Sequence, residues 1–235
     1  MRKLSSFVIT VLTLLCVTST LYSQLPMSVK ATSEKFVVYQ MMFHLWGNKQ
    51  TELVRNGSYQ TNGVTKFKDV SDVALKALKN KGITHVYATG LIEHATIENF
   101  AAFGSPIDHP SVVKGRAGSP FAIKDYYDVN PFLADEPAKR MEEFKAMLKR
   151  FHANGLKLVI DFVPNHLARQ YSSDQKPQGV IDFGVNDNKH VAFDVNNNFY
   201  YLPGTQFSVP EGVHPPVPVN IPYIEIPAKV SGNNV

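Results

Sequence analysis

One segment, residues 156–166, constrains the fold more than any other. Its sequence, Leu-Lys-Leu-Val-Ile-Asp-Phe-Val-Pro-Asn-His, begins as a nearly continuous apolar run rich in β-branched residues. Such a run is typical of a strand that is buried on both faces of a parallel sheet. Pro164 cannot donate a hydrogen bond to a neighbouring strand, so the strand is expected to end there. Asp161, Asn165 and His166 are therefore predicted to lie at the carboxyl end of a strand, where parallel α/β folds bind their ligands.

Helices and strands are predicted to alternate before this segment. Hydrophobic spacing and turn residues predict a strand over residues 36–46, a helix over 69–81, a strand over 83–88, a helix over 135–154 and the strand within 156–166. Gly82 and Gly155 each end a helix directly before a strand. Repeated βα units form a parallel sheet, so the chain is expected to adopt an α/β fold.

Each predicted helix has an apolar face. Asp69 or Ser71 can cap the first helix, because a short polar side chain accepts hydrogen bonds from the free N–H groups at a helix start. Its predicted buried face consists of Val70, Val73, Ala74, Ala77 and Leu78. The predicted buried face of the second helix consists of Met141, Phe144, Leu148 and Phe151. Between them, residues 89–134 carry many glycines and prolines and are expected to form a long functional loop.

The six residues Asp-Phe-Val-Pro-Asn-His, at the end of the strand predicted within residues 156–166, resemble the first signature of the alpha-amylase family, glycoside hydrolase family 13. The resemblance implies that His166 hydrogen-bonds the sugar at the cleavage point. It also implies that Asn165 ligates a structural calcium ion and that Asp161 braces the active site. From these residues alone, the alternative is a buried acid and a hydrogen-bonded histidine that have no role in ligand binding.

A second segment, residues 114–131, also resembles this family, which carries Gly-x-x-aromatic and then Asp-x-Tyr after its second strand. Phe121, Asp125 and Tyr127 fit that spacing. The resemblance implies that Phe121 stacks on the sugar and that Tyr127 braces the site. The family usually has tyrosine at the first position, and Phe121 keeps the stacking ring without the hydroxyl. The alternative is that Phe121, Tyr126 and Tyr127 simply hold the long loop in place.

The resemblance implies a (β/α)8 barrel, of which this chain is expected to hold only the amino-terminal portion. Residues 36–166 would supply about three strands and two helices, and residues 167–235 an irregular inserted lobe in which the chain ends. Eight βα units need roughly 250 residues. Because an open three-stranded sheet leaves its edges exposed, the isolated chain is expected to be unstable or to aggregate.

No catalytic carboxylate is assigned within the chain. The family carries its nucleophile in a Gly-hydrophobic-Arg-hydrophobic-Asp motif, and the sequence contains no Gly-x-Arg-x-Asp. The nucleophile and the acid/base are therefore expected beyond Val235. Glu211 and Glu225 lie in a proline-rich segment with no predicted strand to position them, and neither is expected to be catalytic.

The amino terminus predicts export. Arg2 and Lys3 precede an apolar run over residues 7–17, the pattern of a secretory signal peptide, here assigned to residues 1–23 with a linker over 24–35. The product is expected in the periplasm or outside the cell, without a membrane span. A lipid anchor at Cys16, the only cysteine, is disfavoured because Leu15 is bulky.

These patterns exclude several classes of protein. The formal net charge of +4 with scattered lysines does not indicate nucleic-acid binding. There is no Gly-x-Ser-x-Gly motif for serine hydrolysis and no His-x-x-x-His pair for zinc. The expected function is an alpha-amylase-type glycosidase of carbohydrate metabolism that acts on alpha-glucosidic bonds of starch-like or malto-oligosaccharide substrates. The expected partners are that saccharide and the missing carboxyl-terminal portion of the enzyme.

Two alternatives stay open at this point. One is a non-catalytic secreted carbohydrate-binding or scaffold protein derived from the same fold. The other is an unrelated exported α/β binding protein, for which the motif matches would be coincidence.

Overall fold

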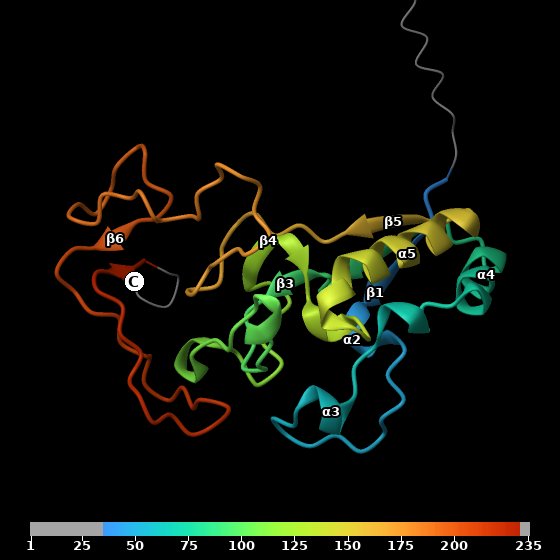
Figure 1. Cartoon of the computed structure of the whole chain (residues 1–235), viewed down its shortest axis with the longest axis horizontal. Coiled ribbons are helices and arrows are strands. Elements are labelled where there is room, and N and C mark those ends of the chain that lie inside the picture. The colour runs from blue at the N-terminus through green and yellow to red at the C-terminus, as the bar shows by residue number, and fades with distance from the viewer. Residues whose placement is uncertain (1–34, 231–235) are drawn as a thin grey trace, which may run out of the picture. The chain divides into compact units, whose positions relative to one another are not determined.

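The computed structural model describes residues 35–230, and the predicted signal peptide and Cys16 lie outside the described residues. Three strands form a parallel sheet in the order β1-β2-β5, with bounds Val38–Met42, His85–Thr89 and Lys157–Ile160 (Figure 1). Val86 pairs with Tyr39 on one side and with Leu158 on the other. The parallel sheet expected from the sequence is confirmed. Within residues 35–230 it does not close into a barrel.

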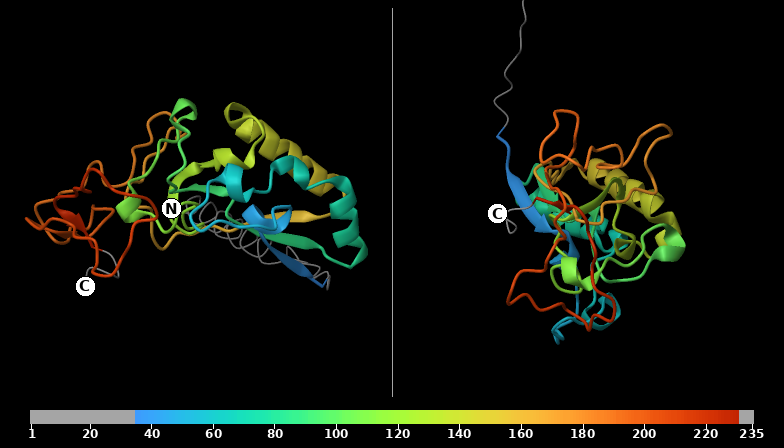
Figure 2. Two further views of the ribbon diagram at one scale, coloured as in Figure 1. Left: turned by 90° about the horizontal axis from the view of Figure 1, so that it is seen from below. Right: turned by 90° about the vertical axis from the view of Figure 1, so that its left-hand side faces the viewer.

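Two helices, α4 (Asp72–Asn80) and α5 (Arg140–Ala153), lie on the same face of this sheet (Figure 2). Their buried side chains join those of the strands in one apolar cluster, which includes Met41, Leu75, Leu78, Val86, Ala88, Phe144, Met147 and Phe151. The hydroxyl of Ser71 accepts a hydrogen bond from the N–H of Ala74, so Ser71 is the cap of α4. The uncovered face of the sheet carries the alternate side chains of each strand.

The buried face of α4 differs from the prediction. Leu75 and Leu78 are buried, whereas Val73 is 79% exposed and Ala77 is also exposed. The two leucines bury more apolar surface than a valine and an alanine, so they determine which side of the helix packs inward. In α5 the centre of the buried face is Met147 rather than Leu148.

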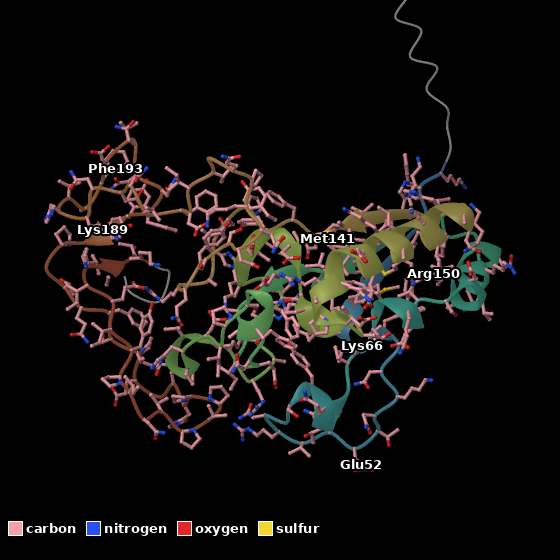
Figure 3. All side chains as sticks on the ribbon, in the orientation of Figure 1. Glu52, Lys66, Met141, Arg150, Lys189 and Phe193 are labelled. Atoms are coloured by element: carbon pink, nitrogen blue, oxygen red, sulfur yellow. The ribbon has the colours of Figure 1, made fainter. Side chains whose placement is uncertain are left out.

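A side chain of α5 connects this helix to the segment that leads into α4. Arg150 donates hydrogen bonds to the main-chain oxygens of Val70 at 3.0 Å and Phe67 at 2.6 Å (Figure 3). Phe67 lies in the short 3-10 helix η1 (Phe67–Asp69), which comes before α4. These charge-assisted bonds satisfy backbone oxygens where the chain leaves one element and enters the next.

The first strand is shorter than predicted. It ends at Met42, and residues 43–46 form a helical turn, α2 (Phe43–Trp46), instead of continuing the strand. Phe43 is fully buried against Phe67, with ring centroids 5.7 Å apart. The apolar run continues through this turn because Phe43 and Trp46 pack on the core from a helical backbone, whereas Leu45 is 63% exposed.

The predicted loop over residues 89–134 contains a sheet of its own. Strands β3 (Ile92–His94) and β4 (Ile123–Val129) pair antiparallel with irregular register. The remainder is irregular chain interrupted by short 3-10 helices: η2 (Ala101–Phe103), η3 (Pro110–Val112) and η4 (Pro131–Leu133). Two further short helices, α3 (Tyr59–Asn62) and η5 (Pro137–Lys139), precede α4 and α5 respectively.

Strand β5 lies within residues 156–166, which were predicted to form a strand buried on both faces. It is not buried on both faces, so that prediction was wrong. Val159 and Ile160 are each 38% exposed, and Phe162 just beyond them is 62% exposed. Among the described residues β5 is an edge strand, and the helices cover only one of its faces. An exposed apolar edge of this kind is a site for association with other chains.

Residues 167–230 form an irregular lobe whose only regular elements are the two-residue strands β6 (Tyr201–Leu202) and β7 (Ala228–Lys229). Side chains hold it together: Asp187 accepts hydrogen bonds from the N–H groups of Asn198 and Phe199 and from the hydroxyl of Tyr201. In the part of the chain described here, no helix is long and apolar enough to cross a membrane.

Candidate functional site

Asp161 follows β5 directly, as the sequence predicts. Its N–H donates to the main-chain oxygen of Ala88 at 3.1 Å, which extends the pairing with β2 by one residue. Its carboxylate accepts hydrogen bonds from the hydroxyls of Tyr87 at 2.6 Å and Thr89 at 3.1 Å. The bond to Asp161 raises the pKa of the Tyr87 phenol, because loss of that proton would place two negative charges together. Asp161 therefore joins β5 to β2 at their carboxyl ends.

The residues that follow Asp161 line a cleft with a volume of about 1240 Å³. One part of its lining comes from β4 and the segment after β5, and the other part comes from the lobe. The lining residues are Tyr126, Tyr127, Phe162, Pro164, Asn165, His166, Leu167, Ala168, Arg169, Phe183, Asn198, Phe199, Tyr200, Lys229 and Val230. Pockets for small ligands span roughly 300–1,000 Å³, so this cleft has room for a ligand of several rings.

Aromatic side chains join the two sides of the cleft. The ring centroids of Tyr126 and Phe162 lie 5.3 Å apart, and Phe183 of the lobe meets Tyr126 edge to face at 6.3 Å. Tyr171 contacts both Tyr126 and Phe183. The hydroxyl of Tyr126 also donates to the main-chain oxygen of Val163. Aromatic faces of this kind pack against the C–H faces of sugars while neighbouring polar groups orient them.

Asn165 and His166 both line this cleft and both are exposed. The side-chain amide of Asn165 lies 3.4 Å from Nδ1 of His166. An amide that donates to Nδ1 leaves the imidazole proton on Nε2, which is then a donor for a ligand. The contact of His166 with a sugar, expected from the sequence, stays a prediction.

The calcium ion expected at Asn165 requires more ligands than this residue alone. Calcium takes six to eight oxygen ligands, several of them carboxylates. The three carboxylates that come together within residues 35–230 are Glu93, Asp125 and Asp174, and they lie on β3, on β4 and in the lobe. Asn165 is not a member of that group, and its metal-binding role stays a prediction.

The two site residues predicted from residues 114–131, Phe121 and Tyr127, lie in different places. Tyr127, on β4, lines the cleft and is 42% exposed, and its N–H donates to the carboxylate of Asp125 at 2.7 Å. Phe121 is 43% exposed in the turn before β4 and is not among the residues that line the cleft. Their roles in binding and bracing stay predictions, and only Tyr127 is at the cleft.

Sequence reasoning missed the lobe's contribution to the cleft. Tyr200 is 60% exposed and stacks on Phe193, with ring centroids 5.6 Å apart at 20°. Phe183 and Phe199 line the cleft from the same lobe. The run Phe-Tyr-Tyr at residues 199–201 was the available signal, because only Tyr201 enters a strand while Phe199 and Tyr200 before it line the cleft.

The carboxylate of Glu225 is held by several hydrogen bonds within the protein. Its carboxylate accepts hydrogen bonds from Arg169 at 2.5 Å, from the hydroxyl of Tyr223 at 2.8 Å and from the N–H of Lys229 at 2.8 Å. Burial and the bond to Glu225 raise the pKa of Tyr223. These bonds tie the end of the lobe to the segment after β5.

Two neighbouring histidines, the buried His94 at the end of β3 and the partly buried His44 in α2, are held without charge. The rings of His44 and His94 stack with centroids 5.0 Å apart. Nε2 of His94 donates to the main-chain oxygen of Ala117, and its Nδ1 accepts from the side-chain amide of Asn130. Burial lowers the pKa of His44 to about 4, and burial together with the proximity of His44 lowers the pKa of His94 to about 3. A Cβ on Gly118 would lie 1.8 Å from the main-chain oxygen of Ala95, so only glycine fits this close approach beside the pair.

The chain is similar in part to cyclomaltodextrin glucanotransferases and, over a shorter stretch, to an alpha-glucosidase. No protein-family model matches it. It is 30% identical over 139 residues to a cyclomaltodextrin glucanotransferase of Bacillus sp. (strain 38-2), covering 57% of this chain and 17% of that protein. It is 23% identical over 185 residues to a cyclomaltodextrin glucanotransferase of Geobacillus stearothermophilus, covering 73% of this chain and 24% of that protein.

Two further similarities were found, one over a short segment and one to a solved structure. An alpha-glucosidase of Culex pipiens is 39% identical over 51 residues, which is 21% of this chain and 9% of that protein. Among solved structures, an alpha-amylase from Lactobacillus plantarum is 21% identical with a TM-score of 0.38, covering 57% of this chain and 24% of that one. The chain thus spans less than a quarter of the length of each of these proteins.

Proposed function

Because this chain is related to the cyclomaltodextrin glucanotransferases and resembles the alpha-amylase family, we propose that it is the amino-terminal part of an exported glycosidase that acts on alpha-glucosidic bonds. Its substrate is a starch-like polysaccharide or a malto-oligosaccharide. In this proposal β1, β2 and β5 are the first three strands of a (β/α)8 barrel, and residues 167–230 belong to a lobe inserted after the third strand.

The observation that carries the proposal is the cleft between β4, the segment after β5 and the lobe. It lies at the carboxyl end of β5, where barrel enzymes bind their substrates. Its aromatic lining suits the apolar faces of glucose rings, and the exposed imidazole of His166 supplies a donor for a sugar hydroxyl. Asp161 holds the two strand ends together, so the donor projects from a rigid base.

In this proposal the cleft binds the sugar, and the catalytic carboxyl groups come from other residues. Retaining glycosidases need two carboxyl groups about 5 Å apart on either side of the scissile bond. None of the fifteen residues that line the cleft is an aspartate or a glutamate. The catalytic pair is therefore supplied by residues outside these 235, as is the remainder of any calcium site that includes Asn165.

A second candidate function is a carbohydrate-binding protein without hydrolytic activity. The same acid-free lining favours it, because aromatic faces and a histidine suffice for binding. The two candidates differ in whether a longer product of the same reading frame exists and cleaves sugar.

The experiment is an activity assay of two proteins, the 235-residue chain and any longer product encoded downstream of the Val235 codon. Both are incubated with a soluble malto-oligosaccharide, and released reducing sugar is measured. The glycosidase proposal expects cleavage by the longer product alone. Cleavage by the 235-residue chain on its own would contradict the division of binding and chemistry. Sugar binding without a longer product would favour the second candidate.

A further inference from the structure

We infer that Glu93, Asp125 and Asp174 form a binding site for one divalent cation, with calcium preferred, which fastens the lobe to the β3–β4 sheet. This carboxylate cluster is separate from Asn165 and from the cleft, and it does not depend on the proposed function. One oxygen or more from each of the three side chains lies within 4.8 Å of the others. That spacing is about twice a calcium–oxygen bond of roughly 2.4 Å, so one ion can touch all three.

The three carboxylates come from parts of the chain that are far apart in sequence. Glu93 is the middle residue of β3, Asp125 lies opposite it in β4, and Asp174 follows in the lobe. The carboxylate of Asp125 accepts hydrogen bonds from the N–H groups of Asp174 at 3.1 Å and Gln175 at 3.4 Å. The lobe segment is thus already anchored at the cluster by its backbone.

The decisive observation is a buried oxygen without a partner. Glu93 is only 2% exposed, and its Oε2 has no hydrogen-bond partner. A buried carboxylate oxygen that lacks a donor carries the full cost of its lost hydration. A cation in the cluster would supply the missing partner. Without one, burial raises the pKa of Glu93 to about 7, with the neighbouring Asp128 and Asp125 acting in the same direction.

The nearby cations neutralise the cluster only in part. Lys124 donates to Asp108 at 2.9 Å, and both side chains are 3% exposed. Arg140 is paired with Asp128 and reaches Asp174 only at 3.4 Å. Each cation therefore already has an acid of its own. The three carboxylates of the cluster together keep an excess of negative charge in a largely buried place.

The backbone also makes room for the third carboxylate. Gly104 has a φ of +89°, and a Cβ at this position would lie 1.8 Å from Oδ2 of Asp174. Any side chain here would displace Asp174 from the cluster. The serine that follows, Ser105, hydrogen-bonds the carboxylate of Glu93 and favours its charged form. The segment at residues 104–105 thus borders the cluster from a further side.

The donor chemistry selects the kind of ion. Three carboxylates and no nitrogen or sulfur ligand suit a hard cation such as calcium or magnesium. Calcium accepts irregular geometry with long bonds, whereas magnesium needs bonds of about 2.1 Å in a near-octahedral arrangement. A catalytic role for the same acids is disfavoured, because Glu93 and Asp125 are 2% and 0% exposed and neither lines the cleft.

The test measures calcium binding by equilibrium dialysis with radiolabelled calcium, using the 235-residue chain freed of metal with EDTA. The variants are Glu93→Gln, Asp125→Asn and Asp174→Asn, each of which keeps the side-chain shape and removes the charge. The matched control is Glu52→Gln, which removes an exposed carboxylate elsewhere. Asn165→Ala separates this site from the one expected from the sequence. Thermal unfolding in calcium and in EDTA is followed on the same samples.

We expect one calcium ion per chain, bound about tenfold or more weakly by each cluster variant and unchanged in the Glu52 and Asn165 variants. Calcium should raise the melting temperature of the unaltered chain and not that of Glu93→Gln. In EDTA near neutral pH, Glu93→Gln should melt no lower than the unaltered chain, because it removes a buried charge without a partner. That result distinguishes loss of a calcium ligand from loss of the fold. Asp174→Asn tests the same site at a partly exposed side chain.

Three results would overturn the inference. The first is a folded, unaltered chain that binds no calcium, in which case the acids share a proton instead. The second is calcium binding that survives both Glu93→Gln and Asp125→Asn. The third is binding that is lost in Asn165→Ala and kept in the cluster variants, which would assign the ion to the site after β5.

Discussion

The stacked histidine pair makes the fold sensitive to acid. His44 and His94 are held neutral in the folded chain, with pKa values lowered to about 4 and about 3 from 6.5. In the unfolded chain both rings bind protons as the pH falls below 6.5. The unfolded state therefore gains protons that the folded state excludes. The stability that these histidines contribute is fully present above that pH and is lost as the pH falls toward their folded pKa values.

The size of the effect follows from the difference in proton binding. At about pH 5 each unfolded histidine is stabilised by protonation by about 2 kcal/mol, so the pair lowers the free energy of unfolding by about 4 kcal/mol relative to about pH 7.5. This result depends little on the folded pKa values, as long as both lie well below the assay pH. Glu93 acts in the opposite direction, because its raised pKa makes its contribution greatest at low pH. A comparison of variants cancels that contribution.

The perturbation is His44→Gln. A glutamine amide can still donate to the main-chain oxygen of Gly90, as Nε2 of His44 does at 3.2 Å, but it does not titrate. Urea unfolding is followed by the fluorescence of Trp46, the only tryptophan, at several pH values and at low protein concentration. Between about pH 7.5 and pH 5 the variant should lose about 2 kcal/mol less stability than the unaltered chain.

The exposed His190 provides the control, because His190→Gln removes a ring that is already in water. Its curve of unfolding free energy against pH should be parallel to that of the unaltered chain. If His44→Gln also gives a parallel curve, His44 is not kept neutral by burial, and the reasoning from the stacked pair is refuted.

Three further predictions concern stability and association. Lys124→Met should destabilise the fold by about 3–5 kcal/mol because it leaves Asp108 buried without its cation, and the double variant Lys124→Met with Asp108→Leu should recover most of the loss in urea unfolding. Ser71→Ala should cost about 1 kcal/mol through loss of the α4 cap, whereas Val73→Ala, at a position that is 79% exposed, should change the same measurement by less than about 0.5 kcal/mol. Val159→Thr with Ile160→Thr should reduce self-association in sedimentation experiments, because both aliphatic side chains are 38% exposed on an edge strand, and unchanged association would show that this edge is not the contact.

Local patterns predicted the sheet and the position of Asp161. The run before Asp161 is continuous in sequence, so its strand and the polar residues after it could be placed without tertiary information. Gly82 and Gly155 marked the ends of the two helices correctly to within a few residues. Periodicity was less informative about which side of α4 is buried, since Leu75 and Val73 are both apolar and only packing distinguishes them.

The features that could not be predicted arise from contacts between distant segments. The β3–β4 pair depends on Asn130, whose side-chain amide donates to the main-chain oxygens of Gly90 and Ile92 forty and thirty-eight residues earlier. The carboxylate cluster unites residues 93, 125 and 174, which no spacing in the sequence connects. Exposure of β5 was also missed, because an apolar run does not reveal whether a neighbouring layer is present.

The measurement that tests the account most directly is the binding of maltoheptaose to the 235-residue chain by equilibrium titration, with a β-linked gluco-oligosaccharide of similar length as the contrast. The account predicts binding of the alpha-linked sugar alone, weakened about tenfold or more by His166→Ala, since that change removes a donor from the cleft. His190→Ala, an exposed histidine outside the lining of the cleft, should leave the affinity unchanged. Absence of binding by the folded chain, or equal affinity in His166→Ala, would contradict the claim that this cleft recognises alpha-glucans.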